Sequence, residues 1–253
     1  MFARTGGEDP LAEEEILDRL DLPLEETSRA LLDLAKVNRW LFGSRALRVT
    51  LLPLLLRTMR ARFTLLDVAA GAGDAMAPLR RAVRSSGAEL EVVSLDRKLS
   101  HLLQGRRRGH IKGAVVARAE RLPFVASSFD WTASSLFFHH LDDDGKREVI
   151  GEMTRVSRNA AIIIDLRRSR WAGWALRVSS VLLRMGAIAR DDGLVSIRRS
   201  WTVREWKVFL GPGTADLKRR FPARVALVVP PPRALESCAE EAAGGNSKRL
   251  QTA

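Results

Sequence analysis

The stretch Phe63–Asp74, FTLLDVAAGAGD, limits the possible folds of this chain more than any other. Residues 63–68 form a short apolar run that is typical of a strand buried on both faces. The run leads into a loop of small residues, 69–73, and a helical pattern follows from Asp74. Because glycine lets a backbone approach closely and a helix N-terminus offers unpaired N–H groups, the stretch predicts a cradle for a polar ligand.

This loop differs from two common phosphate-binding loops. A dinucleotide fingerprint needs a third glycine where this chain has Met76, and the G-x-x-x-x-G-K-[ST] pattern of mononucleotide loops is missing. Asp67, near the end of the predicted strand, would repel a pyrophosphate, but it suits a ligand that carries an ammonium group. The loop therefore favours a ligand other than a dinucleotide.

A second buried strand is predicted at 90–95, and it ends at Asp96, 23 positions after Gly73. This spacing is expected for one β-α-β unit. An acid at this point can accept hydrogen bonds from two ribose hydroxyls. The alternative is that Asp96 caps the helix that begins near Lys98.

The segment 117–143, ARAERLPFVASSFDWTASSLFFHHLDD, adds a longer motif. It contains LPF at 122–124, FD at 129–130 and two adjacent histidines at 139–140. With the D-x-A-x-G-x-G-D pattern of residues 67–74, it resembles the class I S-adenosylmethionine-dependent methyltransferases. The resemblance covers about residues 63–230.

The resemblance implies an α/β fold: a doubly wound, Rossmann-like sheet of seven strands, mostly parallel, with one antiparallel strand. Residues 1–62 would form an N-terminal helical cap, and 63–230 the methyltransferase domain. A helical insertion after the fifth strand would serve as a lid at about 168–200. Residues 231–253, rich in Pro, Ala and Gly, are expected to be a disordered tail.

The implied cofactor is S-adenosyl-L-methionine, with Asp67 and the glycine loop at its amino acid moiety and Asp96 at its ribose. Arg118 stands where the family usually has an Asp that receives the adenine amino group, so Glu120 or the backbone near Ala119 would make that contact. The residues expected to bind the cofactor are Asp67, Ala69, Gly71, Gly73, Asp74, Asp96, Arg97, Ala119, Glu120 and Ser135.

His139 and His140 are the candidate catalytic residues. They follow a fourth strand predicted at 131–137, at the edge where open α/β sheets bind their ligands. With an unperturbed pKa of about 6.5, a histidine there could act as a general base toward a phenol or a similar hydroxyl. The alternative is a positioning or packing role.

The later part of the chain predicts a helix at 142–156, a turn at 157–159 and a fifth strand at 160–165. Asp165 ends that strand, either as a substrate contact or as a cap of the next helix. A helical segment at 171–189 is expected to break at 191–193. Thr202 is predicted to cap a helix that ends before Gly211, and 215–220 with 224–229 to form a hairpin.

The N-terminal part shows helical patterns at 11–35, 26–40 and 45–62, the last containing Pro53, which should kink or divide it. These segments would either form the cap over the site or pack on the sheet edge.

Composition narrows the function classes. The net charge is +12, with 35 Arg against 7 Lys. General basicity explains this charge better than a nucleic-acid site, since no aromatic residues interleave with the tightest cluster, 106–108. An anionic substrate or membrane surface stays plausible. The single Cys238 excludes an intramolecular disulfide and a cysteine-based metal site, and we expect no metal.

No apolar run is long enough for a transmembrane helix, and the first residues lack the apolar core of a secretory signal, so we expect a cytoplasmic protein. The predicted activity is methyl transfer to a small-molecule acceptor such as a phenol, a quinol or a secondary metabolite, and a homodimer stays open. One alternative is an RNA or protein methyltransferase. Another is a non-catalytic binding protein, which Arg118, Ala69 and the missing Pro-Gly-Gly turn keep open.

Overall fold

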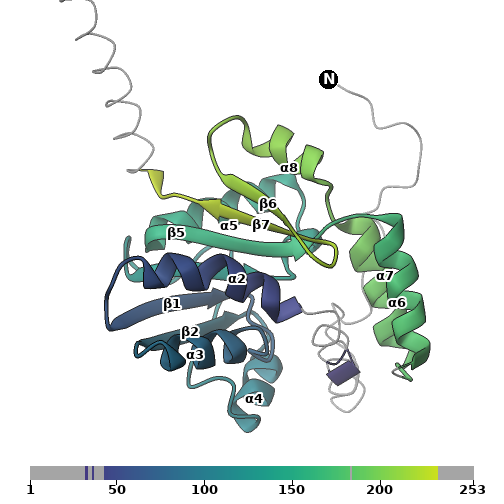
Figure 1. The fold of residues 1–253 in the computed structure, drawn as a ribbon, viewed down its shortest axis with the longest axis horizontal. Coiled ribbons are helices and arrows are strands. Elements are labelled where there is room, and N and C mark those ends of the chain that lie inside the picture. Colours follow the sequence, from purple (N-terminus) through teal and green to yellow (C-terminus); the bar gives the residue numbers. More distant parts are fainter. Residues whose placement is uncertain (1–31, 34–35, 37–42, 183, 233–253) are drawn as a thin grey trace, which may run out of the picture.

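The computed structural model describes residues 32–33, 36, 43–182 and 184–232. Its centre is one seven-stranded sheet with the order β3-β2-β1-β4-β5-β7-β6 (Figure 1). β1 to β5 run parallel, and β7 is antiparallel to both of its neighbours. The predicted fold class, with one antiparallel strand, is confirmed. The strands are β1 Arg62–Val68, β2 Glu89–Asp96, β3 Gly113–Val116, β4 Phe129–Ser135, β5 Ser157–Leu166, β6 Asp216–Arg220 and β7 Arg224–Val229.

Helices cover both faces of this sheet (Figure 1). Because successive side chains of a strand point to opposite faces, Ile162 and Ile164 of β5 pack with α2 and α3, whereas Ile163 packs with α5 and α8. This double burial explains why the strands read as unbroken apolar runs. The helices are α2 Gly43–Leu56, α3 Met76–Ser85, α4 Leu99–Arg107, α5 Asp143–Val156, α6 Arg170–Leu182, α7 Ala187–Arg199 and α8 Val203–Leu210, with the short 3₁₀ helix η2 at Phe138–His140.

α2 is part of the core and not a cap over the ligand edge. Its residues Leu47, Leu51 and Leu55 are fully buried against the sheet beside α3. Pro53 lies inside the helix, which continues to Leu56 without division. This segment packs on a face of the sheet, whereas the alternative drawn from the sequence was packing on the sheet edge. Most of the predicted N-terminal cap and the predicted tail lie outside the described residues.

The predicted turn at 157–159 is wrong. α5 leads directly into β5, which begins at Ser157. The Asn159 side chain donates to the carbonyl of Asp130 at 2.9 Å, and the Ser157 hydroxyl donates to the carbonyl of Ala160 at 2.9 Å. These polar side chains thus bond to strand backbone instead of forming a turn.

The helical insertion after the fifth strand is confirmed, but its break is not where the sequence indicated. Asp191-Asp192-Gly193 lies inside α7, and the chain turns between α6 and α7 at about Gly186. A Cβ on Gly193 would lie 2.8 Å from the Leu176 side chain, so this glycine lets α6 and α7 pack closely. The N–H of Gly186 donates to Asp33 at 3.0 Å.

Two later predictions are confirmed. Thr202 caps α8 in a reciprocal capping box, since its hydroxyl accepts from the Glu205 N–H while the Glu205 carboxylate accepts from the Thr202 N–H. β6 and β7 form the predicted hairpin. None of the helices in the described part of the chain has the length and apolar character needed to cross a membrane.

Candidate functional site

The loop after β1 holds an unusual backbone conformation. Ala69, Gly71 and Gly73 all have positive φ angles, of 55°, 55° and 72°. The N–H of Ala70 donates to Leu95 of β2 at 2.9 Å, which joins the loop to the neighbouring strand. A residue with a Cβ pays about 1–2 kcal/mol in this conformation, so Ala69 stores backbone strain beside the predicted cradle.

The two glycines of the loop have different roles. A Cβ on Gly71 would meet nothing within 4 Å, whereas a Cβ on Gly73 would lie 2.7 Å from Ile111. Gly71 is therefore the point where a ligand can approach the backbone. Gly73 instead allows the loop to pack against the chain after α4.

A third glycine, Gly105 of α4, packs directly against the backbone of the loop. A Cβ there would lie 2.7 Å from the carbonyl oxygen of Ala72 and 2.5 Å from the Ile111 side chain. We did not identify this residue from the sequence. The available signal was a glycine inside a helical pattern, which often marks a close approach.

We predict that Gly105→Ala displaces the loop and weakens cofactor binding about tenfold, because backbone cannot yield to a methyl group at this distance. Overpacking of this kind also costs about 1–3 kcal/mol of stability. Calorimetry and urea unfolding would measure the two effects. Gly173→Ala on α6, where a Cβ meets nothing within 4 Å, is the matched control. Unchanged affinity in Gly105→Ala would contradict a supporting role.

Asp96 connects the loop to the next helix. Its carboxylate accepts the N–H of Gly71 at 2.8 Å and the N–H of Lys98 at 2.9 Å, and His101 lies 3.6 Å away. Burial acts to raise the pKa of Asp96, but the contacts with His101 and the two backbone N–H groups outweigh it, so the pKa is lowered. The helix-capping contact thus exists, and each oxygen keeps lone-pair capacity for a ligand hydroxyl.

Asp67 is buried with one carboxylate oxygen that accepts no hydrogen bond from any described residue. Desolvation, and then the charge of Asp96, raises the pKa of Asp67 well above its ordinary value. A buried acceptor without a partner is costly unless a ligand pairs with it. The ammonium group of an amino acid moiety has the right chemistry for that position.

The raised pKa makes a prediction about stability. In the folded protein Asp67 keeps its proton above about pH 3.9, the pKa of an aspartate in an unfolded chain. The contribution of Asp67 to the free energy of unfolding is therefore fully present at low pH and is lost as the pH rises through the raised pKa. Asp67→Asn should remove that loss. We expect the variant to gain stability relative to the wild type between pH 5 and pH 8, measured by urea unfolding. Parallel curves for the two proteins would contradict the raised pKa.

Asp74 ties the loop to the segment after α4. It pairs with His110 at 3.1 Å and with Arg108 at 3.7 Å. Ser135 is the last residue of β4 and is partly buried, and Arg97 is exposed between β2 and α4. The structure therefore places these three predicted cofactor residues at the carboxyl edge of the sheet, with Asp74 turned to protein partners.

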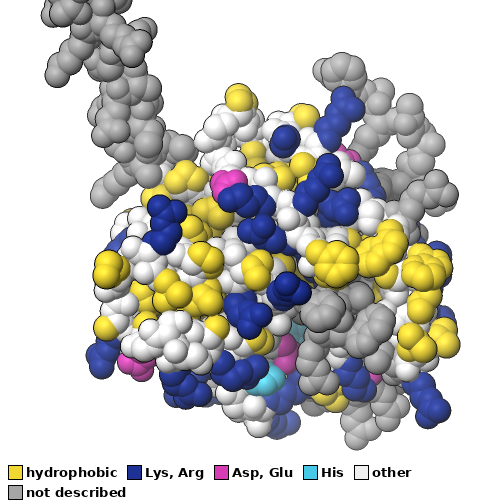
Figure 2. All heavy atoms as spheres, viewed as in Figure 1, with side chains coloured by type: hydrophobic (Ala, Val, Ile, Leu, Met, Phe, Trp, Pro, Cys, Tyr) yellow, Lys and Arg dark blue, Asp and Glu magenta, His cyan; other side chains and the backbone are white. Residues whose placement is uncertain are grey.

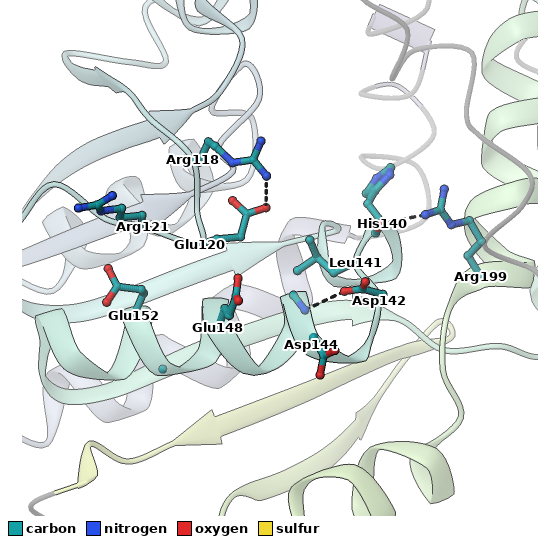
Figure 3. A pocket seen from close by; sticks show the side chains of 12 residues that line it. Arg118, Glu120, Arg121, His140, Leu141, Asp142, Asp144, Glu148, Glu152 and Arg199 are labelled. Atoms are coloured by element: carbon teal, nitrogen blue, oxygen red, sulfur yellow. Dashed lines mark hydrogen bonds and ion pairs between the residues drawn. The ribbon is translucent and has the colours of Figure 1, made fainter.

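Ala119 and Glu120 follow β3. Ala119 is buried, and Glu120 accepts a hydrogen bond from the Arg118 guanidinium at 3.0 Å (Figure 3). Arg118, which stands where the family usually has an acid, is thus paired with Glu120, the acid expected to make the adenine contact instead. Both side chains line a groove of about 1080 Å³.

This groove lies beside the cradle. Its walls come from the segment after β3, from the turn at 140–142, from α5 as far as Glu152 and from Arg199 of α7 (Figure 3). Acidic side chains of α5, Glu148 among them, and arginines of the other walls share this lining. Glu120, a predicted adenine contact, lines the groove, whereas Asp67, the glycine loop and Asp96 do not, so the groove would adjoin the adenine end of the cofactor and offers room for a second molecule beyond it.

The two candidate histidines occupy different environments. His139 is buried, with its Nδ1 2.7 Å from the Asp165 carboxylate, which also accepts the Leu166 N–H at 2.8 Å. Asp165 is therefore neither a helix cap nor an exposed substrate contact. His140 is half-buried and lines the groove, with its ring centroid 4.3 Å from that of His139. A histidine oriented by a carboxylate is typical of proton transfer sites.

Residues 138–141, which carry both histidines, are called the histidine turn below. Two buried cations donate hydrogen bonds to its backbone, and we did not identify either from the sequence. Arg199 donates to the carbonyl of His140 at 2.9 Å (Figure 3), and Lys146 donates to the carbonyl of Leu141. Burial lowers the pKa of Lys146 to about 8, although the charges of Asp143 and Asp165 oppose this. Among the described residues, no group of three His, Cys, Asp or Glu side chains could hold a metal ion.

Comparison with known proteins identifies a matching family and solved structures with a similar fold. Residues 65–160 match the family described as Methyltransferase domain. The fold is similar to that of the plantazolicin methyltransferase BamL, solved with a triazolic desmethylPZN analog and SAH, at 12% identity over 81% of this chain and 91% of that chain, with a TM-score of 0.59. It is also similar to magnesium protoporphyrin IX methyltransferase from Synechocystis PCC 6803 with bound SAH, at 14% identity, 75% and 84% coverage, and a TM-score of 0.50. No curated protein sequence matches the chain.

Proposed function

We propose that this chain, whose residues 65–160 match a methyltransferase domain family, is a class I S-adenosylmethionine-dependent methyltransferase that methylates a small molecule with an acidic hydroxyl, such as a phenol or a quinol. The observation that carries this proposal is the histidine turn. In it, His140 lines a groove beside the predicted cofactor position, and the buried His139–Asp165 pair lies next to the His140 ring.

Asp67 would pair with the ammonium group of the cofactor, the Gly71 backbone would contact its amino acid moiety, and Asp96 would accept the ribose hydroxyls. Ala119 and Glu120 would contact the adenine, and Ser135 would lie near the methionine end. The orphaned oxygen of Asp67 and the open space at Gly71 support this assignment. S-adenosylmethionine, when bound, supplies an electrophilic methyl group. The chain then has to align the acceptor oxygen with it, and such alignment accounts for much of the rate.

His140 would take the proton of the acceptor hydroxyl, because it is the histidine that lines the groove. His139 is too buried to reach an acceptor, so we assign it a positioning role. The Asp165 carboxylate orients the His139 ring, and Lys146 and Arg199 hold the backbone of the turn. The α6–α7 insertion would form one wall of the acceptor site, since Arg199 of α7 lines the groove.

Of the two structural neighbours, one is a plantazolicin methyltransferase solved with a triazolic desmethylPZN analog, and the other is a magnesium protoporphyrin IX methyltransferase. Their likeness supports the small-molecule class, while the particular acceptor of this chain follows from its own groove. The mixture of arginines and carboxylates there suits a polar, partly ionised ring system better than an aliphatic chain.

The test has two stages. Calorimetric titration with S-adenosylmethionine and S-adenosylhomocysteine should show binding in the micromolar range. A panel of phenols and quinols would then be incubated with the protein and methyl-labelled cofactor, and products identified by mass spectrometry. Labelled methyl ethers support the proposal. Cofactor binding with labelling of carboxylates or amines only, in a wider panel, would overturn the acceptor class.

A further inference from the structure

The helix α6 exposes both of its tryptophans and two large aliphatic side chains, while apart from Leu176 its buried residues are small, which is unusual for a surface helix. Its inner face consists of Ala172, Ala175, Ser179 and Ser180, with Leu176 packed against α7. The outer face carries two tryptophans, Trp171 and Trp174, the latter 61% exposed. One turn further on, Val181 is 77% exposed and Leu182 is also exposed.

The inner face already has its partners. The Ser179 hydroxyl donates to the carbonyl of Ala175 at 2.6 Å, and Ser180 donates to Arg177 at 2.7 Å, so the buried polar atoms are satisfied within the helix. A rotation of α6 that buried its outer side chains would therefore bring a satisfied inner face out to solvent, so such a rotation does not explain the exposed apolar residues.

The apolar surface extends beyond α6. Phe221, at the turn between β6 and β7, is 70% exposed, and its ring centroid lies 6.1 Å from that of Trp171. Figure 2 shows hydrophobic side chains gathered over α6 with basic side chains nearby. We call this set, Trp171, Trp174, Val181, Leu182 and Phe221, the α6 surface. Contiguous exposed apolar surface of this kind usually marks an interaction site.

The charge around the α6 surface indicates its partner. Residues 166–190 contain six arginines and no acidic residue, and two of these arginines, Arg168 and Arg190, pair with acids outside this range. Arg177 is exposed on the outer face of α6 between Trp174 and Val181. Tryptophans and long basic side chains on one face are the composition of helices that lie in the plane of an anionic bilayer surface, where the rings enter the headgroup region and the cations meet phosphates.

We propose that the α6 surface binds an anionic phospholipid bilayer, with the chain lying on the membrane. A second copy fits less well, because the same surface on a partner would bring like-charged arginines together without an acid to pair with them. The α6–α7 insertion contacts the candidate site through Arg199, so a bound membrane would lie against the wall of the groove. The proposal does not depend on the methyl acceptor.

The test is sedimentation of the full chain with vesicles of phosphatidylcholine alone or with about one third phosphatidylglycerol, at low and high salt. We expect binding to the anionic vesicles only, weakened by salt. The double variant Trp171→Ala/Trp174→Ala and the single variant Arg177→Glu should each reduce the partition coefficient at least tenfold. Val125→Ala, which changes an exposed apolar residue on the β3–β4 connection, is the matched control and should bind like the wild type.

Three results would overturn the proposal. The first is equal binding of wild type and variants, and the second is equal binding to neutral and anionic vesicles. The third is the absence of binding to anionic vesicles at low salt, and two further measurements would then identify another occupant of the surface. A dimer in analytical ultracentrifugation that the tryptophan double variant dissociates would identify a second copy. Tryptophans protected from acrylamide in the vesicle-free monomer would identify a segment of the same chain, such as the acidic residues 8–26.

Discussion

Asp96→Ala should weaken S-adenosylmethionine binding by at least about 100-fold, the largest effect on cofactor affinity that we expect from a single substitution. The carboxylate would accept two ribose hydroxyls, and hydrogen bonds to a charged group contribute about 1.5–3 kcal/mol each. The same carboxylate holds the N–H groups of Gly71 and Lys98, so its removal also frees the glycine loop from α4. Calorimetric titration of the purified variant measures the loss.

Two controls separate ligand contact from loop support. Asp96→Asn keeps an acceptor for one backbone N–H and should show an intermediate loss. Asp216→Ala removes an exposed acid of β6 whose carboxylate pairs with the side chain of Lys218 at 2.8 Å, and it should bind like the wild type. Binding by Asp96→Ala within about threefold of wild type, less than 1 kcal/mol, would show that Asp96 does not hold the ribose.

His140→Ala is expected to lower kcat by about 10²- to 10³-fold, because a positioned general base contributes about 10²- to 10⁴-fold. Cofactor affinity should stay close to the wild-type value, since His140 lines the groove and not the cradle. Initial rates with a methylated product as readout, together with calorimetric titration of the cofactor, would check both points.

Asp216→Ala, which changes the exposed acid of β6 that pairs with Lys218, is the control and should keep the wild-type kcat. Asp165→Asn provides a further comparison, since it should lower kcat less than His140→Ala does. A His140→Ala variant with wild-type kcat would show that the acceptor loses its proton without this histidine.

The sequence was most informative where local pattern alone decides structure. The run at 63–68 and its glycine loop predicted β1 and the bend after it, because a buried parallel strand has to be apolar on both faces. Thr202 predicted the start of α8, since its cap involves residues only three positions apart. The hairpin of β6 and β7 is equally local. All three predictions are confirmed.

The wrong predictions involve residues whose behaviour depends on distant partners. Asp191-Asp192-Gly193 suggested a helix break, yet packing against Leu176 of α6 keeps it inside α7. Residues 157–159 suggested a turn, yet Asn159 and Ser157 bond to the backbone of β4 and β5. In both places tertiary contacts outweigh weak local preferences.

The candidate site also contains a part that the sequence predicts and a part that only the tertiary structure shows. The sequence by itself determined the sheet, the glycine loop and the acids at the ends of β1 and β2, because the alternation of strand and helix brings the carboxyl ends of parallel strands to one edge. Only the tertiary structure paired His139 with Asp165, placed Gly105 under the loop and brought Lys146 and Arg199 to the histidine turn. These contacts join separate elements through side-chain geometry that neither residue type nor spacing encodes, and packing alone decides them.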